Sequence, residues 1–287
     1  MKRYRILSFD FDSRAHSLEP IQEQWDEVVK EQHRKNQERT IKGLVTEFGE
    51  YAIEQKVNNF KELKFKPFSV AAFHNKFLEQ VRRSYVMGCY YPALTGACAL
   101  GERILNHMVL LLRDYHKDAP EYKKLYRKQS FDYWPQAIDA LEGWGHLLPE
   151  AAEKFRELNE KRNRAIHFNP ETDHNDKELA LEAIHVLQSI VEIQFSAFGN
   201  QPWYFCIPGE MYIKKEWEDH PLIMHVFIPN CLYVGPNHRV DSISPQVRVS
   251  DLSDLSDLSD LSDLSDLSDY EDRAITDEEF TQLRTSC

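Results

Sequence analysis

The sequence predicts a mainly α-helical protein: a central helical bundle, a long helical N-terminal region, a small β-rich segment and a disordered acidic tail. Three observations support this prediction. Apolar residues recur three and four positions apart over most of the first 199 residues. The 287 residues include only 10 glycines and 13 prolines. After residue 199 the chain changes to short aromatic and β-branched runs, and it ends in an acidic repeat.

The first 65 residues are predicted to form a strand followed by helices. The run "YRILSFDF" near the N-terminus alternates apolar with other residues, which is typical of a strand. Pro20 then begins a helical pattern that continues to about Leu63. Residues 30–39 are polar all round, so they either form a solvated turn of one long helix or separate two helices. Residues 1–65 are therefore expected to be a region of their own.

Residues 66–199 are expected to form the helical bundle. Ser69 suits the N-cap of its first helix, and Pro92 suits the first turn of the second, which is the most hydrophobic helix in the chain. Asn175, with Glu178 three residues later, is typical of a capping box at the start of the last helix. The predicted helices cover residues 70–85, 92–116, 135–143, 149–168 and 176–198.

Residues 200–249 are predicted to be a small β-rich segment. Short aromatic and β-branched runs alternate there with proline, glycine and asparagine, which is typical of strands and hairpins. The N-terminal strand could join this sheet. The predicted strands cover residues 203–207, 210–215, 222–229 and 231–235.

Residues 250–287 are predicted to be a disordered acidic tail. The triplet "DLS" occurs six times from Asp251 to Ser268. Leucine at every third position winds around a helix and builds no apolar face, because each step turns by about 300°. The tail holds 12 acidic and two basic residues, so the formal charge of −12 lies mostly there and the remaining 249 residues are nearly neutral. It could be a plain solvated tail, or it could mask a basic RNA groove.

The composition indicates a cytoplasmic protein without a metal or cofactor. The five cysteines are scattered and form no Cys-x-x-Cys pair, which is typical of reduced thiols; Cys98 lies in an apolar helix and is expected in the core. No run of about 18 apolar residues predicts a membrane span. The basic start of the chain is too short and too acidic for a secretory signal.

The stretch "EKRNRAIHFNPET" holds the candidate catalytic residues Arg162, Asn163 and His167. Pro170 disfavours helical geometry in the residue before it, so this helix should end near Phe168 with His167 in its last turn. A histidine there can act as acid or base, and an arginine can hold a phosphate and stabilise developing charge. On its own, the spacing favours an ordinary polar helix end over a catalytic site.

"RNRAIH" resembles the signature of the HEPN superfamily, in which an arginine and a polar neighbour precede a histidine by four to six residues. The strongly apolar helix upstream, with Glu102 in the acidic position, is similar to the corresponding HEPN helix. The resemblance covers about residues 69–198. One position departs from it, because Asn106 stands where some toxin-type members carry lysine.

The resemblance implies a helical bundle that acts as a metal-independent endoribonuclease, often in phage defence or toxin–antitoxin systems. It implies Arg162 and His167 as catalytic residues, Asn163 as their support and Glu102 as the anchor of the site. It also implies RNA as substrate, a homodimer with a composite active site, and a possible antitoxin or regulatory protein as partner. The alternative is a non-catalytic module of the same type that binds RNA or a protein.

A second candidate site is the pair Asp10 and Asp12 in "ILSFDFDSRA". Two aspartates with one residue between them at a strand end resemble the first motif of HAD-type phosphatases. Those enzymes need a parallel α/β domain, whereas a long helical region follows here. The pattern therefore favours solvated carboxylates at the end of a strand.

Overall fold

The computed structural model describes the chain except residues 71, 167–173, 197–200, 242–247, 252–272 and 287. The chain forms two compact units, and each is described by itself. The larger unit is Phe9–Gly199, and the smaller one combines Met1–Ser8 with Asn200–Cys287. The predicted boundary at residue 65 does not coincide with this division, because residues 9–65 belong to the larger unit.

The larger unit begins with a strand hairpin and two helices. Its first elements are β2 (Phe9–Asp12), the 3-10 turn η1 (Arg14–Leu18), α1 (Glu27–Phe48), α2 (Ile53–Glu62) and β3 (Lys66–Val70). Strands β2 and β3 pair in antiparallel register, and α2 packs on the first helix of the bundle, which joins this region to it. The polar residues 30–39 continue α1; the chain turns instead at Gly49 and Ala52, both with positive φ.

The predicted N-cap at Ser69 is wrong. Ser69 lies in β3, where its hydroxyl bonds the side chain of Asn75 at 2.7 Å. The first bundle helix, α3 (Phe73–Val86), begins four residues later. A small polar side chain such as serine is common both at a helix N-cap and at the end of a strand. Here Ser69 pairs with Asp10 of β2, so it belongs to the strand.

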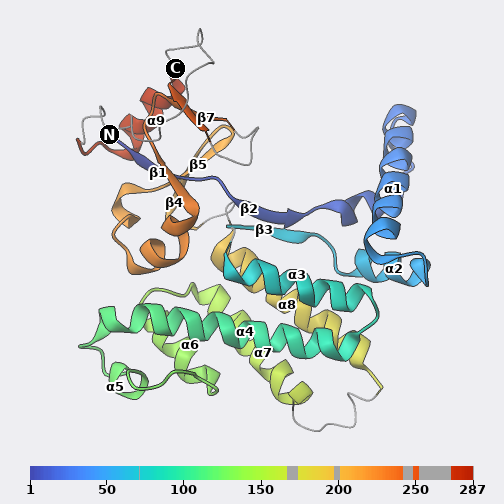
Figure 1. Cartoon of the computed structure of the whole chain (residues 1–287), viewed down its shortest axis with the longest axis horizontal. Helices are drawn as coiled ribbons and strands as arrows, with labels where there is room; N and C mark the ends of the chain where they lie inside the picture. Colours follow the sequence, from blue (N-terminus) through green and yellow to red (C-terminus); the bar gives the residue numbers. More distant parts are fainter. Residues whose placement is uncertain (71, 167–173, 197–200, 242–247, 252–272, 287) are drawn as a thin grey trace. The chain divides into compact units, whose positions relative to one another are not determined.

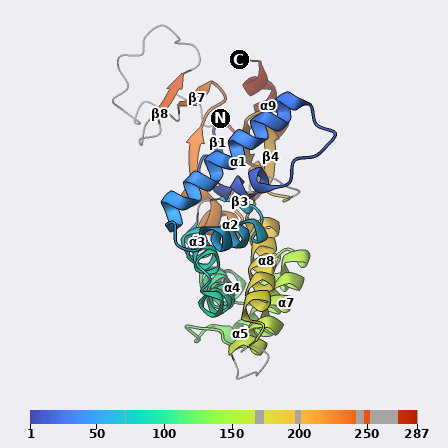
Figure 2. The ribbon, with the colours of Figure 1, turned by 90° about the vertical axis from the view of Figure 1, so that its right-hand side faces the viewer.

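Five further helices complete the larger unit. They are α4 (Tyr90–Leu112), α5 (Tyr122–Leu125), α6 (Trp134–Gly143), α7 (Pro149–Ile166) and α8 (Asp176–Phe195), with the 3-10 turn η2 (Arg113–His116) after α4. Figure 2 shows α3 and α4 in one layer and α7 and α8 in the other. Helix α4 packs against α3, α6, α7 and α8 and is the central element of the bundle (Figure 1). Cys98 lies in its buried face, as predicted.

The smaller unit is built on a four-stranded antiparallel sheet with the order β4-β5-β1-β6. The N-terminal strand is part of it. The elements of the sheet are β1 (Arg3–Ile6), β4 (Tyr204–Ile207), β5 (Glu210–Ile213) and β6 (Cys231–Val234). Short turns η4 (Lys215–Trp217), η5 (Ile223–Phe227) and η6 (Ile228–Asn230) and the hairpin of β7 (His238–Asp241) and β8 (Arg248–Asp251) complete the β-rich part.

The strand predicted at residues 222–229 is wrong. Residues 223–227 form a π-helical turn and residues 228–230 a 3-10 turn. Ile223 and Phe227, four positions apart, are both fully buried. A short continuous apolar run does not distinguish strand from helix by its pattern, and here the four-residue spacing decides.

The tail predicted to be disordered contains a folded helix, α9 (Asp277–Thr285). Thr276 caps it by accepting a hydrogen bond from the Glu279 amide at 3.1 Å. Phe280 is fully buried against Tyr212 of the sheet, and Arg284 binds the carboxylate of Glu210 at 2.7 Å. Apart from Asp251, which ends β8, the acidic repeat lies outside the described residues. Helix α9 forms because an apolar anchor and a cap follow the repeat. None of the described helices has an apolar stretch long enough to cross a membrane.

Phe280→Ala is expected to destabilise the smaller unit by about 3–5 kcal/mol, because it leaves a cavity over Tyr212. Hydrogen exchange of the β5 and β1 amides measures this loss as faster exchange. Gln282→Ala, on the exposed side of the same helix, is the matched control. Unchanged β5 and β1 protection in Phe280→Ala would show that α9 does not stabilise the sheet.

His74 predicts a pH dependence of stability in the larger unit. Its ring is fully buried beside Phe195, and within the described part of the chain neither ring nitrogen has a hydrogen-bond partner. Burial lowers its pKa to about 3, whereas an unfolded histidine has a pKa of about 6.5. Below pH of about 6.5 only the unfolded chain binds this proton, so stability falls as the pH falls toward 3.

We expect the free energy of unfolding to lose about 1.4 kcal/mol per pH unit from this group between pH 6 and 4. Urea unfolding at several pH values measures the slope. The slope should be smaller by that amount in His74→Phe, and unchanged in His174→Gln, which replaces an exposed histidine. Parallel slopes for wild type and His74→Phe would contradict the assignment.

Candidate functional site

Arg162 occupies a core-facing position of α7. The buried residues of this helix recur at Ala151, Phe155, Leu158 and Ala165, and Arg162 continues the same four-and-three spacing. Its side chain is 19% exposed. A charge in an apolar stripe needs a partner, because burying an unpaired charge is strongly unfavourable.

The partner of Arg162 is Glu102 of α4. The Nη2 atom of Arg162 lies 3.0 Å from Oε2 of Glu102. The same carboxylate oxygen accepts a hydrogen bond from Nε1 of the buried Trp134 at 3.1 Å. The guanidinium carbon lies 5.8 Å from the centre of a Trp134 ring. Side chains from α4, α6 and α7 therefore meet at one carboxylate.

Gly101 allows this meeting. A Cβ atom at this position would lie 2.6 Å from Leu158 and 2.8 Å from Trp134. Both distances are below any ordinary van der Waals contact, so α7 and the Trp134 ring approach the α4 backbone only because residue 101 has no side chain. This close approach brings Arg162 to Glu102.

Asn106 fixes the segment that carries Trp134. Its side-chain Oδ1 accepts from the Phe131 amide at 2.7 Å, and its Nδ2 donates to the Phe131 carbonyl at 3.2 Å. The position where some HEPN toxins carry lysine thus has a structural task here. The same Nδ2 atom lies 2.8 Å from the Glu102 carbonyl, which ties this segment to the turn that holds the acid.

The guanidinium of Arg162 retains donor capacity. Its Nε atom is buried and has no hydrogen-bond partner among the residues that the structure describes. Asn163 lies on the exposed flank, with Oδ1 3.5 Å from Nη1 of Arg162, at the limit of a hydrogen bond. Burial raises the pKa of the nearby Cys98 thiol to about 12, so this cysteine stays protonated.

The predicted site residues are thus placed in part. The structure joins Arg162 to Glu102 and places Asn163 beside them. His167 lies outside the described residues, and α7 is described to Ile166. Trp134 and Gly101 belong to the site, although their patterns did not suggest it. The signals that could have found them are a glycine directly before Glu102 and a tryptophan at the start of a short helix.

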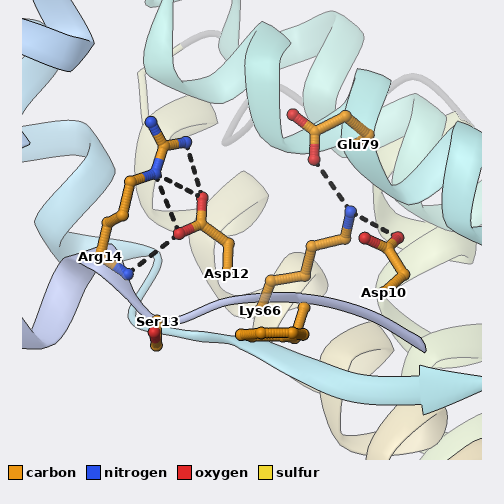
Figure 3. Close-up of a pocket in the computed structure, with 7 residues that line it drawn as sticks. Asp10, Asp12, Ser13, Arg14, Lys66 and Glu79 are labelled. Atoms are coloured by element: carbon orange, nitrogen blue, oxygen red, sulfur yellow. Dashed lines mark hydrogen bonds and ion pairs between the residues drawn. The ribbon is translucent and has the colours of Figure 1, made fainter. Parts of the chain in front are cut away.

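The aspartates of the second candidate site line a hollow of about 400 Å³. Figure 3 shows Lys66 between Asp10 and Glu79, and Arg14 against Asp12. Lys66, only 4% exposed, lies 2.7 Å from Asp10 and 2.9 Å from Glu79. Burial raises the pKa of Asp12, but the hydrogen bonds from Arg14 outweigh it and hold this pKa below its usual range.

This arrangement does not support the phosphatase interpretation. Strand β2 pairs with β3 in antiparallel register, whereas that interpretation needs a parallel sheet. Both aspartates are engaged with internal cations, so the network ties the hairpin to α3 and α1 through pairs such as Arg14–Glu47. In the described part of the chain, no group of three or more histidine, cysteine or acidic side chains is arranged to hold a metal ion.

Gly101→Ala is expected to destabilise the larger unit by about 1–3 kcal/mol, because the new methyl group overlaps Leu158 and Trp134. Urea unfolding measures this loss. Gly143→Ala is the matched control, since nothing lies within 4 Å of a Cβ there and alanine favours the helix. Equal stability of both variants would show that α4 and α7 do not depend on this close approach.

Comparison with known proteins adds no relative. No protein-family model, no curated protein and no solved structure matches the chain. The functional conclusion therefore depends on the residues around Arg162 and on the motif that contains it.

Proposed function

We propose that the chain is a metal-independent endoribonuclease of the HEPN type, with its active site at the end of α7. The observation that carries the proposal is the position of Arg162. It is a guanidinium placed in the core-facing stripe of α7 and held by Glu102 and Trp134, while its buried Nε has no hydrogen-bond partner among the described residues. An arginine so oriented is suited to a phosphate, which accepts two parallel hydrogen bonds.

In the proposed reaction His167 takes the proton of a ribose 2′-OH, and the 2′-oxygen attacks the adjacent phosphorus. The bond from phosphorus to the 5′-oxygen breaks, that oxygen takes a proton from water, and a 2′,3′-cyclic phosphate remains; His167 then returns its proton to the solvent. Arg162 stabilises the negative charge on the phosphoryl oxygens. Glu102 holds Arg162 in place, and Asn163 orients it from the exposed flank.

The proposal includes a homodimer in which two copies of the Arg–His pair form a composite site, and RNA as the substrate. The proposal also includes an antitoxin or regulatory protein as a partner that would restrain the activity. A toxin or phage-defence role is proposed by analogy with the HEPN proteins that the motif resembles. A cytoplasmic location belongs to the same proposal.

The alternative function is a non-catalytic module that binds RNA or a protein. The observation that favours it is the ion pair itself, because Glu102 and Trp134 already give Arg162 a structural role in packing α4 on α7. The two functions differ in their products: only the endoribonuclease leaves shorter RNA.

Incubation of the protein with single-stranded RNA in EDTA is the direct experiment. We expect cleavage by the wild type, with 2′,3′-cyclic phosphate ends. The rate should fall about 100-fold or more in Arg162→Ala and in His167→Ala, because each removes a transition-state contact or the acid–base group. Arg162→Lys should recover little, since lysine lacks the bidentate fork.

Arg156→Ala is the control, because Arg156 lies on the same helix but pairs with Asp139 and Glu142 on the surface. Circular dichroism confirms that each variant is folded. Equal cleavage by wild type and His167→Ala would refute the catalytic assignment. Binding of RNA without any cleavage, in all variants, would establish the alternative.

A further inference from the structure

Two exposed tyrosines belong to the segments that carry Glu102 and Trp134: Tyr91 lies in the first turn of α4, and Tyr133 directly precedes α6. Tyr91 is 50% exposed and Tyr133 is 65% exposed. Tyrosine is enriched at binding interfaces, because its ring is apolar and its hydroxyl is polar.

Tyr91 lies on the same face of α4 as Glu102. Residues 91, 95, 98 and 102 follow one another at intervals of four, three and four positions, which places them in one stripe of the helix. Eleven residues separate Tyr91 from Glu102, a distance of roughly 16 Å along the helix axis. Cys98, in the middle of this stripe, is buried close to Arg162, so the stripe leads from Tyr91 to the guanidinium.

Tyr133 directly precedes Trp134, whose indole donates to Glu102 of the pair. The segment before α6 is held at two points of α4: Asn106 bonds the backbone of Phe131, and Glu102 accepts from the Trp134 indole. Phe131 and Trp134 are buried, whereas Tyr133 between them is exposed. The buried neighbours therefore fix the backbone that presents the Tyr133 ring to solvent.

We propose that Tyr91 and Tyr133 are positioning residues that stack on bases of single-stranded RNA whose phosphate is bound by Arg162. The inference rests on the proposed function, and it adds the strand state of the substrate and two residues that seat it. An aromatic ring stacks on any base and contributes about 1–3 kcal/mol per base. Bases inside a duplex are already stacked on each other, so this arrangement selects unpaired nucleotides.

Fluorescence anisotropy with a labelled single-stranded oligoribonucleotide tests the proposal. His167→Ala is the background for binding, so that the probe stays intact. We expect Tyr91→Ala and Tyr133→Ala to weaken binding about 5- to 100-fold each, the fold-change that corresponds to 1–3 kcal/mol. Phenylalanine at either position should restore binding, because stacking needs the ring and not the hydroxyl.

Tyr51→Ala is the matched control, since Tyr51 is exposed on the α1–α2 turn and lies outside the stripe. In the cleavage reaction, Tyr91→Ala and Tyr133→Ala should raise KM with kcat nearly unchanged, which a general loss of folding would not produce. A duplex of the same sequence should bind less tightly than the single strand.

The two proposals fail in different ways. If Arg162→Ala loses RNA binding while Tyr91→Ala and Tyr133→Ala bind like wild type, the stacking role is wrong and the proposed function stands. Preference for the duplex, or loss of binding in Tyr51→Ala as large as in the other two, also overturns the stacking role. If the protein neither binds nor cleaves RNA, both proposals are wrong.

Discussion

The close approach of α7 and Trp134 to the backbone of α4 at Gly101 is the constraint on which the candidate site depends. Helix α4 is the one element that packs against α3, α6, α7 and α8 in the described part of the bundle. Where two helices approach this closely, side chains on the adjoining turn are near enough to contact each other directly. Glu102 is the next residue, and for that reason its carboxylate meets both the indole of Trp134 and the guanidinium of Arg162.

Buried cations in the larger unit are compensated to different degrees. Arg82 donates to the carbonyls of Leu63 and Lys64 and to the side chain of Gln188, so it closes the end of α2. Lys66 has two carboxylates. The donors of Arg82 and Lys66 are therefore used in contacts that hold the fold together. Burial lowers the pKa of Arg82 to about 10. Arg162 differs, because one carboxylate and one aromatic face hold it while its buried Nε keeps no partner among the described residues.

Much of the helical framework could be predicted from the sequence, because an amphipathic helix records its buried face in its own spacing. The region around Ser69 could not, since a small polar residue suits a cap and a strand equally and only the pairing with β2 decides. The apolar run at 222–229 was ambiguous for a similar reason. Helix α9 was missed because the acidic repeat dominates the composition of the last 38 residues and hides one apolar position, Phe280.

The candidate site was predictable only through its motif. Spacing places Arg162 on a helix, but it does not say which helix faces it, and a contact between residues 102 and 162 is a property of tertiary packing. No local sequence pattern predicts the contacts of Trp134 and Asn106, because their hydrogen-bond partners lie about 25 to 32 residues away in the chain. Such residues become visible only when the backbone is in place.

The packing of α9 on the sheet also has a consequence for mutations in the acidic repeat. The repeat joins two parts of one folded unit, since β8 precedes it and α9 follows it. Gain or loss of whole "DLS" triplets leaves residues 273–286 as they are. A shift of reading frame within the repeat removes Phe280 and Arg284 together and uncovers the Tyr212 face of the sheet. The residues that follow the repeat are therefore as much a part of the sheet's packing as the strands that precede it.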